Sequence, residues 1–173
     1  MALIVETGSV VTGAESYISL ADALTYHANR GNAAWAALAS DTIREQCLRK
    51  ATAYMTGQYR RRWAGYRYIS SQALDWPRSF VPLPDEYFGG VVAYVPNNSV
   101  PVEVQYACAE LALKASIGEL LADQSQQVIR KSLEGIEMEY DKYSPQAKRY
   151  PAIESMLIPY FNSTSSINHE LIR

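Results

Sequence analysis

The chain has few of the residues from which catalytic and metal sites are usually built. Its 173 residues include only two histidines and two cysteines. His27 lies on a predicted helix face, and His169 lies in a polar terminal segment that could not hold catalytic geometry. The sequence also lacks the motifs of zinc proteases, serine hydrolases and P-loop proteins. We therefore expect no enzyme: no catalytic residues, no metal ion and no cofactor.

The two cysteines do not have the spacing of a redox or zinc motif. Cys47 and Cys108 have no CxxC partner and no neighbouring histidine. Both fall on predicted helices among apolar residues, where a cysteine behaves as a small hydrophobic side chain. We predict two buried free thiols, with a disulfide as the alternative.

Long apolar runs are missing as well. No window approaches the roughly 20 apolar residues that a transmembrane helix needs. The opening stretch MALIVETGSVV has no basic residues before its apolar run, and that run is too short for a signal peptide. We expect no membrane partner and synthesis in the cytoplasm.

Phenylalanine and tryptophan are scarce, with three copies each, whereas tyrosine occurs 13 times. Tyrosine combines an apolar face with a polar tip, which suits surfaces that meet other molecules. The net charge is only −2, but it is distributed unevenly. Residues 44–78 hold eight basic and two acidic residues (+6), and the remaining residues hold eight basic and sixteen acidic (−8). This polarity predicts a charged partner or head-to-tail self-association.

The first half of the chain predicts helices. Ser19 lies three residues before Asp22, as in a capping box, and Gly31 marks a helix end. A short helical turn follows at residues 32–38, and a longer helix begins at Ser40 or Asp41. The apolar spacing of that helix predicts a buried stripe. Its members are Ile43, Cys47, Ala51, Tyr54 and Met55.

Regular patterns fail from residue 60 to residue 100, where prolines and a Gly–Gly pair interrupt the chain. A loop of about 40 residues is long for a compact domain, so we expect it to carry function, with a short hairpin around GGVVAYV. Pro101 opens the longest helix, predicted to reach residue 123 and to pack on several sides. A β-hairpin around residues 128–140 and a short helix from Pro151 complete the prediction.

The predicted fold is mainly α with minor β structure. It is a small helical bundle around one long central helix, with a β-hairpin and an extended loop. Residues 1–161 are predicted to form a single domain, with a proline-rich loop at 77–100. Residues 162–173 are predicted to form a polar C-terminal tail.

One short stretch, YRRRWAGYRY at residues 59–68, combines four arginines with four aromatic residues. Such a patch could bind single-stranded nucleic acid, with arginines on phosphates and aromatic rings on bases. Alternatively, Trp63 and some tyrosines pack in the core while the arginines cover a helix end or pair with carboxylates at a protein interface. The acidic whole chain favours protein, and both hypotheses stay open. The candidate subunit or partner interface consists of Arg60, Arg61, Arg62, Trp63 and Arg67.

Four stretches together resemble a known family. In order they are GAESYISLADALTYHANRGNAAWAAL, LRKATAYM with YRRRWAG, SQALDWPRSFV, and VPVEVQYACAELAL. They resemble a tailed-phage family described as DnaT-like single-stranded DNA-binding proteins, which is similar to the head–tail connector, or adaptor, proteins beneath the phage portal. The resemblance covers roughly residues 2–161, and none of its motifs is catalytic.

The resemblance implies a connector-like structural virion protein. Such a protein forms a homo-oligomeric ring of about twelve copies in the phage neck, after synthesis in the host cytoplasm. Its implied partners are the portal protein and the next neck or tail protein, with double-stranded DNA passing through the ring without sequence specificity. The family description implies the alternative, a single-stranded DNA-binding replication protein.

Two further groups of residues are candidates for contacts. In the ALDWPR turn, Pro77 holds Trp76 extended, so Trp76, Pro77 and Arg78 are expected to anchor the loop on the helices, with an interface role for Trp76 as the alternative. The stretch between WPR and VPVEV is longer than we associate with the family, which suggests a phage-specific docking loop. Candidate contacts of the tail are Tyr160, Phe161, Leu171 and Ile172.

Overall fold

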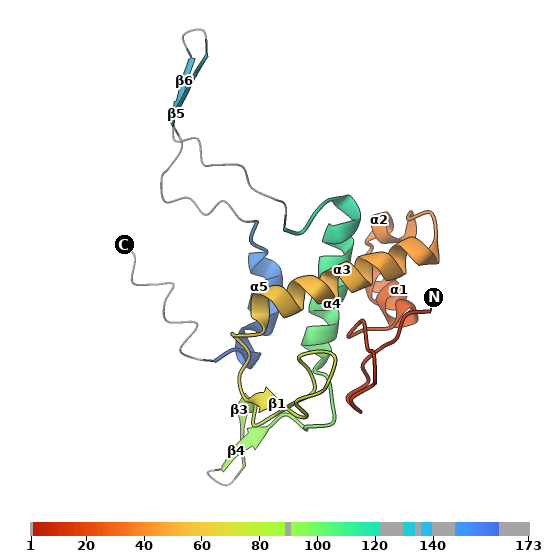
Figure 1. The fold of residues 1–173 in the computed structure, drawn as a ribbon, viewed down its shortest axis with the longest axis vertical. Coiled ribbons are helices and arrows are strands. Elements are labelled where there is room, and N and C mark those ends of the chain that lie inside the picture. The colour runs from red at the N-terminus through yellow and green to blue at the C-terminus, as the bar shows by residue number, and fades with distance from the viewer. Residues whose placement is uncertain (1, 89–90, 122–129, 134–135, 140–147, 163–173) are drawn as a thin grey trace.

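The computed structural model describes residues 2–88, 91–121, 130–133, 136–139 and 148–162 (Figure 1). It is mainly helical with minor β structure, which confirms the predicted fold class. The helices are α1 (Leu20–Asn29), α2 (Ala33–Ala36), α3 (Asp41–Tyr59), α4 (Val102–Ile117) and α5 (Pro151–Leu157), followed by a 3₁₀ turn (Ile158–Tyr160). The strands are β1 (Tyr66–Arg67), β2 (Arg78–Ser79), β3 (Pro82–Phe88), β4 (Val91–Tyr94), β5 (Arg130–Leu133) and β6 (Ile136–Glu139).

Helix α4 lies at the centre of the described fold. In Figure 1, α3 crosses α4, with α1 and α2 near one end of α3 and α5 near the other. Half of the side chains of α4 are buried, and they include the successive residues Ala107, Cys108 and Ala109, which point to different sides of a helix. The prediction of a central helix packed on several sides is therefore confirmed.

The predicted helix boundaries near the N-terminus are confirmed. The Ser19 hydroxyl accepts a hydrogen bond from the backbone N–H of Asp22 at 3.0 Å, and so caps α1. Gly31 follows that helix with φ of +67°, a conformation that glycine adopts without steric cost. Ser40 caps α3 by accepting a hydrogen bond from the N–H of Ile43 at 3.3 Å.

The predicted buried stripe of α3 is wrong at its first member. The side chain of Ile43 is 38% exposed, and the next residue, Arg44, is buried in its place. The Arg44 guanidinium donates hydrogen bonds to the carbonyl oxygens of Trp35, Ala36 and Leu38, at 3.2, 2.7 and 2.7 Å. These bonds satisfy the end of α2, so a charged side chain occupies the inner position that apolar spacing assigned to isoleucine.

Two further expectations concern α4 and the cysteines. Helix α4 ends at Ile117, before the predicted limit at residue 123, because Gly118 follows and glycine disfavours helix by about 1 kcal/mol relative to alanine. Cys47 and Cys108 are both free and buried, which confirms the thiol prediction over the disulfide.

The strands form three antiparallel pairs within the described residues, β1–β2, β3–β4 and β5–β6. The hairpin expected around GGVVAYV is confirmed, although it begins earlier, at Pro82, and has an irregular register between Pro82 and Tyr87. The β5–β6 hairpin is confirmed as well. The proposed loop at 77–100 therefore contains β2, β3 and β4. The division into a domain at 1–161 and a tail stays a prediction.

A cluster of aromatic rings forms the part of the core that lies beneath the arginine-rich stretch. Trp63 and Trp76 are 2% and 0% exposed, and their rings meet edge to face at 5.7 Å. The Phe161 ring lies 5.0 Å from that of Trp63, and Asn162 donates its N–H to the Arg62 carbonyl at 2.7 Å. Phe161 and Asn162 thus attach the end of the described chain to the inner side of the arginine-rich stretch. Across the described residues, no helix has the length and apolar character to cross a bilayer.

Candidate nucleic-acid interface

The stretch at residues 59–68 faces both inward and outward. Tyr59, the last residue of α3, and Trp63 are 1% and 2% exposed. Tyr66 on β1 and the neighbouring Tyr68 are 74% and 47% exposed. Two of the four aromatic residues, Tyr59 and Trp63, therefore pack in the core, and Tyr66 and Tyr68 are accessible to a partner.

Arg60 is tied to a buried carboxylate. Its Nε lies 2.7 Å from Oδ1 of Asp75, whose side chain is completely buried, while the Arg60 side chain is 48% exposed. The hydrogen bond and the charge of Asp75 raise the pKa of Arg60. The second carboxylate oxygen, Oδ2, is buried without a hydrogen-bond partner among the described residues. This ion pair links the end of α3 to the loop that precedes β2.

Arg61 and Arg62 differ in their surroundings. An Arg62 Nη1 lies 3.3 Å from a Glu154 carboxylate oxygen, and its guanidinium stacks 4.2 Å above the Phe161 ring. Arg62 thereby joins the stretch to α5. Arg61 is exposed, and within the described part of the chain it has no hydrogen bond or ion pair.

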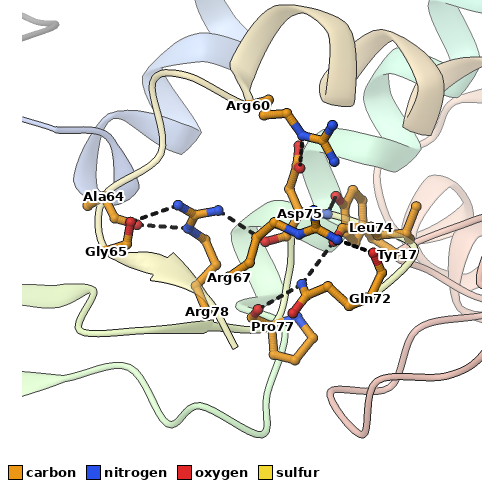
Figure 2. A network of polar contacts seen from close by, with 10 residues as sticks. All are labelled: Tyr17, Arg60, Ala64, Gly65, Arg67, Gln72, Leu74, Asp75, Pro77 and Arg78. Carbon is orange, nitrogen blue, oxygen red and sulfur yellow. Dashed lines mark hydrogen bonds and ion pairs between the residues drawn. The ribbon is translucent and has the colours of Figure 1, made fainter. Parts of the chain in front are cut away.

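Arg78 is a buried structural arginine. Its Nε and Nη2 donate to the carbonyl oxygens of Ala64 and Gly65 at 2.8 Å each, and its Nη1 donates to that of Asp75 at 3.2 Å (Figure 2). Burial lowers its pKa. Arg67, on β1, donates from Nη2 to the carbonyl of Gln72. Arginines thus bind main-chain carbonyls here, but these carbonyls belong to loop residues and not to the helix end that the sequence alternative expected.

The predicted loop-anchor residues are all buried. Trp76 is 0% exposed, and its ring meets that of Tyr160 at 5.7 Å in an edge-to-face arrangement. The Pro77 carbonyl accepts a hydrogen bond from the Gln72 side chain at 3.0 Å, and the Trp76–Pro77 peptide bond is cis. Tyr160 and Phe161, predicted as tail contacts, lie in the core with 8% exposure each. Leu171 and Ile172 lie outside the described residues.

Gly65 sets the position of the exposed Tyr66. Its φ is +62°, and a Cβ atom at this site would lie 2.1 Å from the carbonyl oxygen of Ser79. Only glycine lets the backbone approach β2 this closely. Because Tyr66 pairs with Ser79 in the β1–β2 ladder, this approach presents the tyrosine ring at the surface.

An open hollow lies beside that ring. It has a volume of about 490 Å³ and is lined by Arg60, Tyr66, Arg67, Ser70 and Arg78. Three of the five lining residues are therefore arginines, and the exposed tyrosine stands at its rim. A surface with this composition can contact phosphates and bases together.

The sequence did not lead us to predict two exposed aromatic residues near this surface. Phe80 and Tyr94 are 68% and 52% exposed, and their rings meet edge to face at 6.2 Å. Phe80 has φ of +60°, which is unusual for a bulky residue. Aromatic residues flanking prolines were a weak signal, because nothing in the sequence showed that these rings would face outward.

Much of the uneven charge is balanced inside the chain. Basic residues of the 44–78 segment pair with acidic residues from the rest of the protein. These pairs are Arg49–Glu15 at 2.9 Å, Lys50–Glu119 at 3.4 Å and Arg62–Glu154 at 3.3 Å. The charge polarity of the sequence therefore gives less support to a charged partner than it first suggests.

A second hollow, of about 450 Å³, lies at the α1–α2 junction beside His27 and Trp35. The His27 Nε2 donates to the Ala109 carbonyl at 3.1 Å, while its Nδ1 accepts from the Asn32 side chain at 3.0 Å. Burial lowers the pKa of His27. The Nε2 bond thus ties α1 to α4, and the Nδ1 bond ties α1 to the residue that precedes α2. Among the described residues, no group of three or more His, Cys, Asp or Glu side chains could hold a metal ion.

Comparison with known proteins gives one assignment. No curated protein and no solved structure is significantly similar to the chain. The sequence profile of one family, described as "Putative DnaT-like ssDNA binding protein", matches residues 1–173. The protein therefore belongs to this DnaT-like family.

Proposed function

We propose that the protein binds single-stranded DNA through the surface around Tyr66, with Tyr68, Arg60 and Arg61 beside it. The observation that carries the proposal is the 74% exposure of Tyr66 at the rim of an arginine-lined hollow. The family description supports the same activity. Because ring stacking and phosphate contacts do not depend on base identity, binding without sequence preference is expected.

In the proposed complex, tyrosines contact the bases and arginines contact the phosphates. Exposed tyrosine rings stack on bases, a contact worth roughly 1–3 kcal/mol per base. Arginines contact the phosphates, which releases counterions and makes the affinity depend on salt. Because Asp75 already neutralises part of the Arg60 charge, we expect a shallow salt dependence that corresponds to few phosphates.

The test measures the anisotropy of a labelled single-stranded oligonucleotide near physiological salt. We expect saturable binding, a loss of about tenfold or more in Tyr66→Ala, and near-normal affinity in Tyr66→Phe, which keeps the ring. Arg61→Ala should also weaken binding, whereas Lys114→Ala, on the exposed side of α4, should not. Absence of binding by the natural protein, or equal affinity in Tyr66→Ala, would contradict the proposal.

Reversing the charge of Arg60, Arg61 and Arg62 together is a poor test. Arg60 and Arg62 hold Asp75 and Glu154 within the fold, so the triple variant would disturb folding as well as binding. Single substitutions of Arg61 and Tyr66 test binding without disturbing folding, because both side chains are exposed.

A second candidate is the head–tail connector role. Within the described residues, β3 and β4 pair only with each other, so neither has a second partner strand and another protein could supply one. The exposed Phe80 and Tyr94 lie at this hairpin. We propose, as the alternative, a ring of about twelve copies in the virion neck, docked on the portal and on the next neck protein.

The connector role is tested by assembly. The protein is mixed with the portal protein of the same phage and analysed by light scattering coupled to gel filtration. A complex with about twelve copies would support the connector, and Phe80→Ser should weaken it while the Tyr66→Ala variant assembles normally. A protein that stays monomeric with and without portal would exclude this role.

A further inference from the structure

We infer that the hollow lined by Arg60, Tyr66, Arg67, Ser70 and Arg78 is a phosphate-binding subsite. The inference rests on the proposed function in one respect, since its occupant in the DNA complex is a backbone phosphate. The chemistry it recognises is the phosphate group itself, so free pyrophosphate should also enter the hollow.

The charges around the hollow favour an anion. Arg60, Arg67 and Arg78 lie around Asp75, where Arg60 pairs with the carboxylate and Arg78 donates to the main-chain carbonyl (Figure 2). Arg78 is close enough to experience the charges of Asp75, Arg67 and Arg60. Three cations against one anion leave an excess of positive charge. Since the Asp75 side chain is completely buried and that of Arg60 is 48% exposed, the Arg60 guanidinium and not the carboxylate meets the solvent.

Hydrogen-bond donors remain available in the hollow. Arg60 uses Nε on Asp75, and its two terminal nitrogens have no partner among the described residues. Arg67 uses Nη2 on the Gln72 carbonyl, and its Nη1 has no partner in the described part of the chain. Ser70 adds an exposed hydroxyl. Guanidinium and hydroxyl donors together are the groups that bind phosphate oxygens.

The walls of the hollow are held in place before any ligand arrives. Three nitrogens of Arg78 are bound to main-chain carbonyls, and the Gln72 amide donates to the carbonyls of Leu74 and Pro77 at 2.9 and 3.0 Å. A preorganised site loses less conformational freedom on binding. Tyr66 at the rim then places a ring beside the phosphate, so the hollow and the ring match one nucleotide unit.

Ser70→Asp tests the subsite, with Ser71→Asp as the matched control. Both serines are exposed in the same turn, but only Ser70 lines the hollow. We expect millimolar pyrophosphate to raise the melting temperature of the natural protein and of Ser71→Asp, but not that of Ser70→Asp. In DNA titrations, Ser70→Asp should lose about tenfold in affinity and lower the salt slope by about 0.7, the value of one single-strand phosphate.

The two proposals fail in different ways. No pyrophosphate shift in the natural protein, or equal shifts in both aspartate variants, would overturn the subsite even if DNA binds through Tyr66. A shift that depends on Ser70, without any DNA binding, would keep the subsite and overturn the DNA-binding function. Circular dichroism of both variants checks the fold. Should Ser70→Asp misfold, Ser70→Glu takes its place, and the absence of a shift in the natural protein overturns the subsite without either variant.

Discussion

At the scale of single residues, the Arg60–Asp75 pair shows how the arginine-rich stretch stabilises the fold. Arg60→Met would leave the buried Asp75 carboxylate without its ion pair at 2.7 Å. We expect a loss of about 1–3 kcal/mol in the free energy of unfolding, limited because water reaches the half-exposed Arg60. Urea denaturation measures this loss.

A double-mutant cycle separates this interaction from the loss of the arginine itself. The double variant Arg60→Met/Asp75→Asn should lose less free energy of unfolding than the sum of the losses of the two single variants, because it buries no unpaired charge. Strictly additive losses would show that the pair contributes nothing to stability.

Gly65 offers a second prediction at this scale. In Gly65→Ala the new methyl group would meet the Ser79 carbonyl at 2.1 Å with φ at +62°, so we expect a loss of stability of roughly 2 kcal/mol or more. Gly57→Ala is the control, since nothing lies within 4 Å of the added Cβ on α3 and alanine favours helix. The melting temperature should fall in the first variant and rise slightly in the second. Equal effects would show that the close approach to β2 is not required.

At the scale of elements, His27 links α1 to α4 and makes their packing sensitive to pH. Burial lowers its pKa in the folded protein below the ordinary value, whereas the unfolded chain keeps about 6.5. The unfolded state therefore binds more protons just below pH 6.5, and stability is lost as the pH falls through that range.

We expect the melting temperature to decrease between pH 7.5 and 5.5, and this decrease to be smaller in His27→Gln. All other ionisable groups are common to both proteins, so the difference between the two curves reports His27. Parallel curves would contradict the prediction.

Local patterns explain which elements could be predicted. Ser19, Ser40 and Gly31 act within a few residues of their own positions, so the sequence alone indicates where helices begin and end. The exchange of Ile43 for Arg44 on the inner face of α3 depends on carbonyls of α2, which the spacing of α3 does not reveal. A contact between neighbouring helices thus decided the position that was predicted wrongly on α3, whereas the early end of α4 follows from the local Gly118.

The candidate site divides in the same way. Composition drew attention to residues 59–68, and the alternatives for that stretch already included packing, carboxylate pairing and DNA contacts. The sequence could not assign these roles to individual residues. Tyr66 is turned outward by the approach of Gly65 to Ser79, and Arg60 is paired with Asp75, which lies 15 residues away in the sequence. Ser70 had no distinguishing signal in the sequence at all.

At the scale of the whole molecule, ion pairs turn a polarised sequence into a more evenly charged protein. The Arg49–Glu15 and Arg62–Glu154 pairs connect the basic segment to the two ends of the described chain. The surface around Tyr66 still keeps the half-exposed Arg60 and the exposed Arg61 beside an exposed ring. The proposed binding of single-stranded DNA at this surface therefore relies on aromatic stacking as much as on charge.

The two buried thiols report the opening of the whole core. Cys108 is 0% exposed on α4, with its Sγ 3.4 Å from the Thr52 hydroxyl of α3, and burial raises its pKa. Cys47 is 5% exposed, and burial raises its pKa too. Because only an accessible thiolate reacts quickly, we expect both to resist Ellman's reagent in the native protein and to react as denaturant opens the core.

Single variants assign the two reactions. Cys47→Ala leaves Cys108 as the only thiol, and its labelling rate should rise with denaturant as steeply as global unfolding does, because α3 and α4 must separate before the reagent can reach it. In Cys108→Ser, the remaining Cys47 should react somewhat sooner, since it lies nearer the surface. Rapid labelling of Cys108 without denaturant would mean that α3 and α4 separate independently of the rest of the fold, and α4 could then not be the centre of its stability.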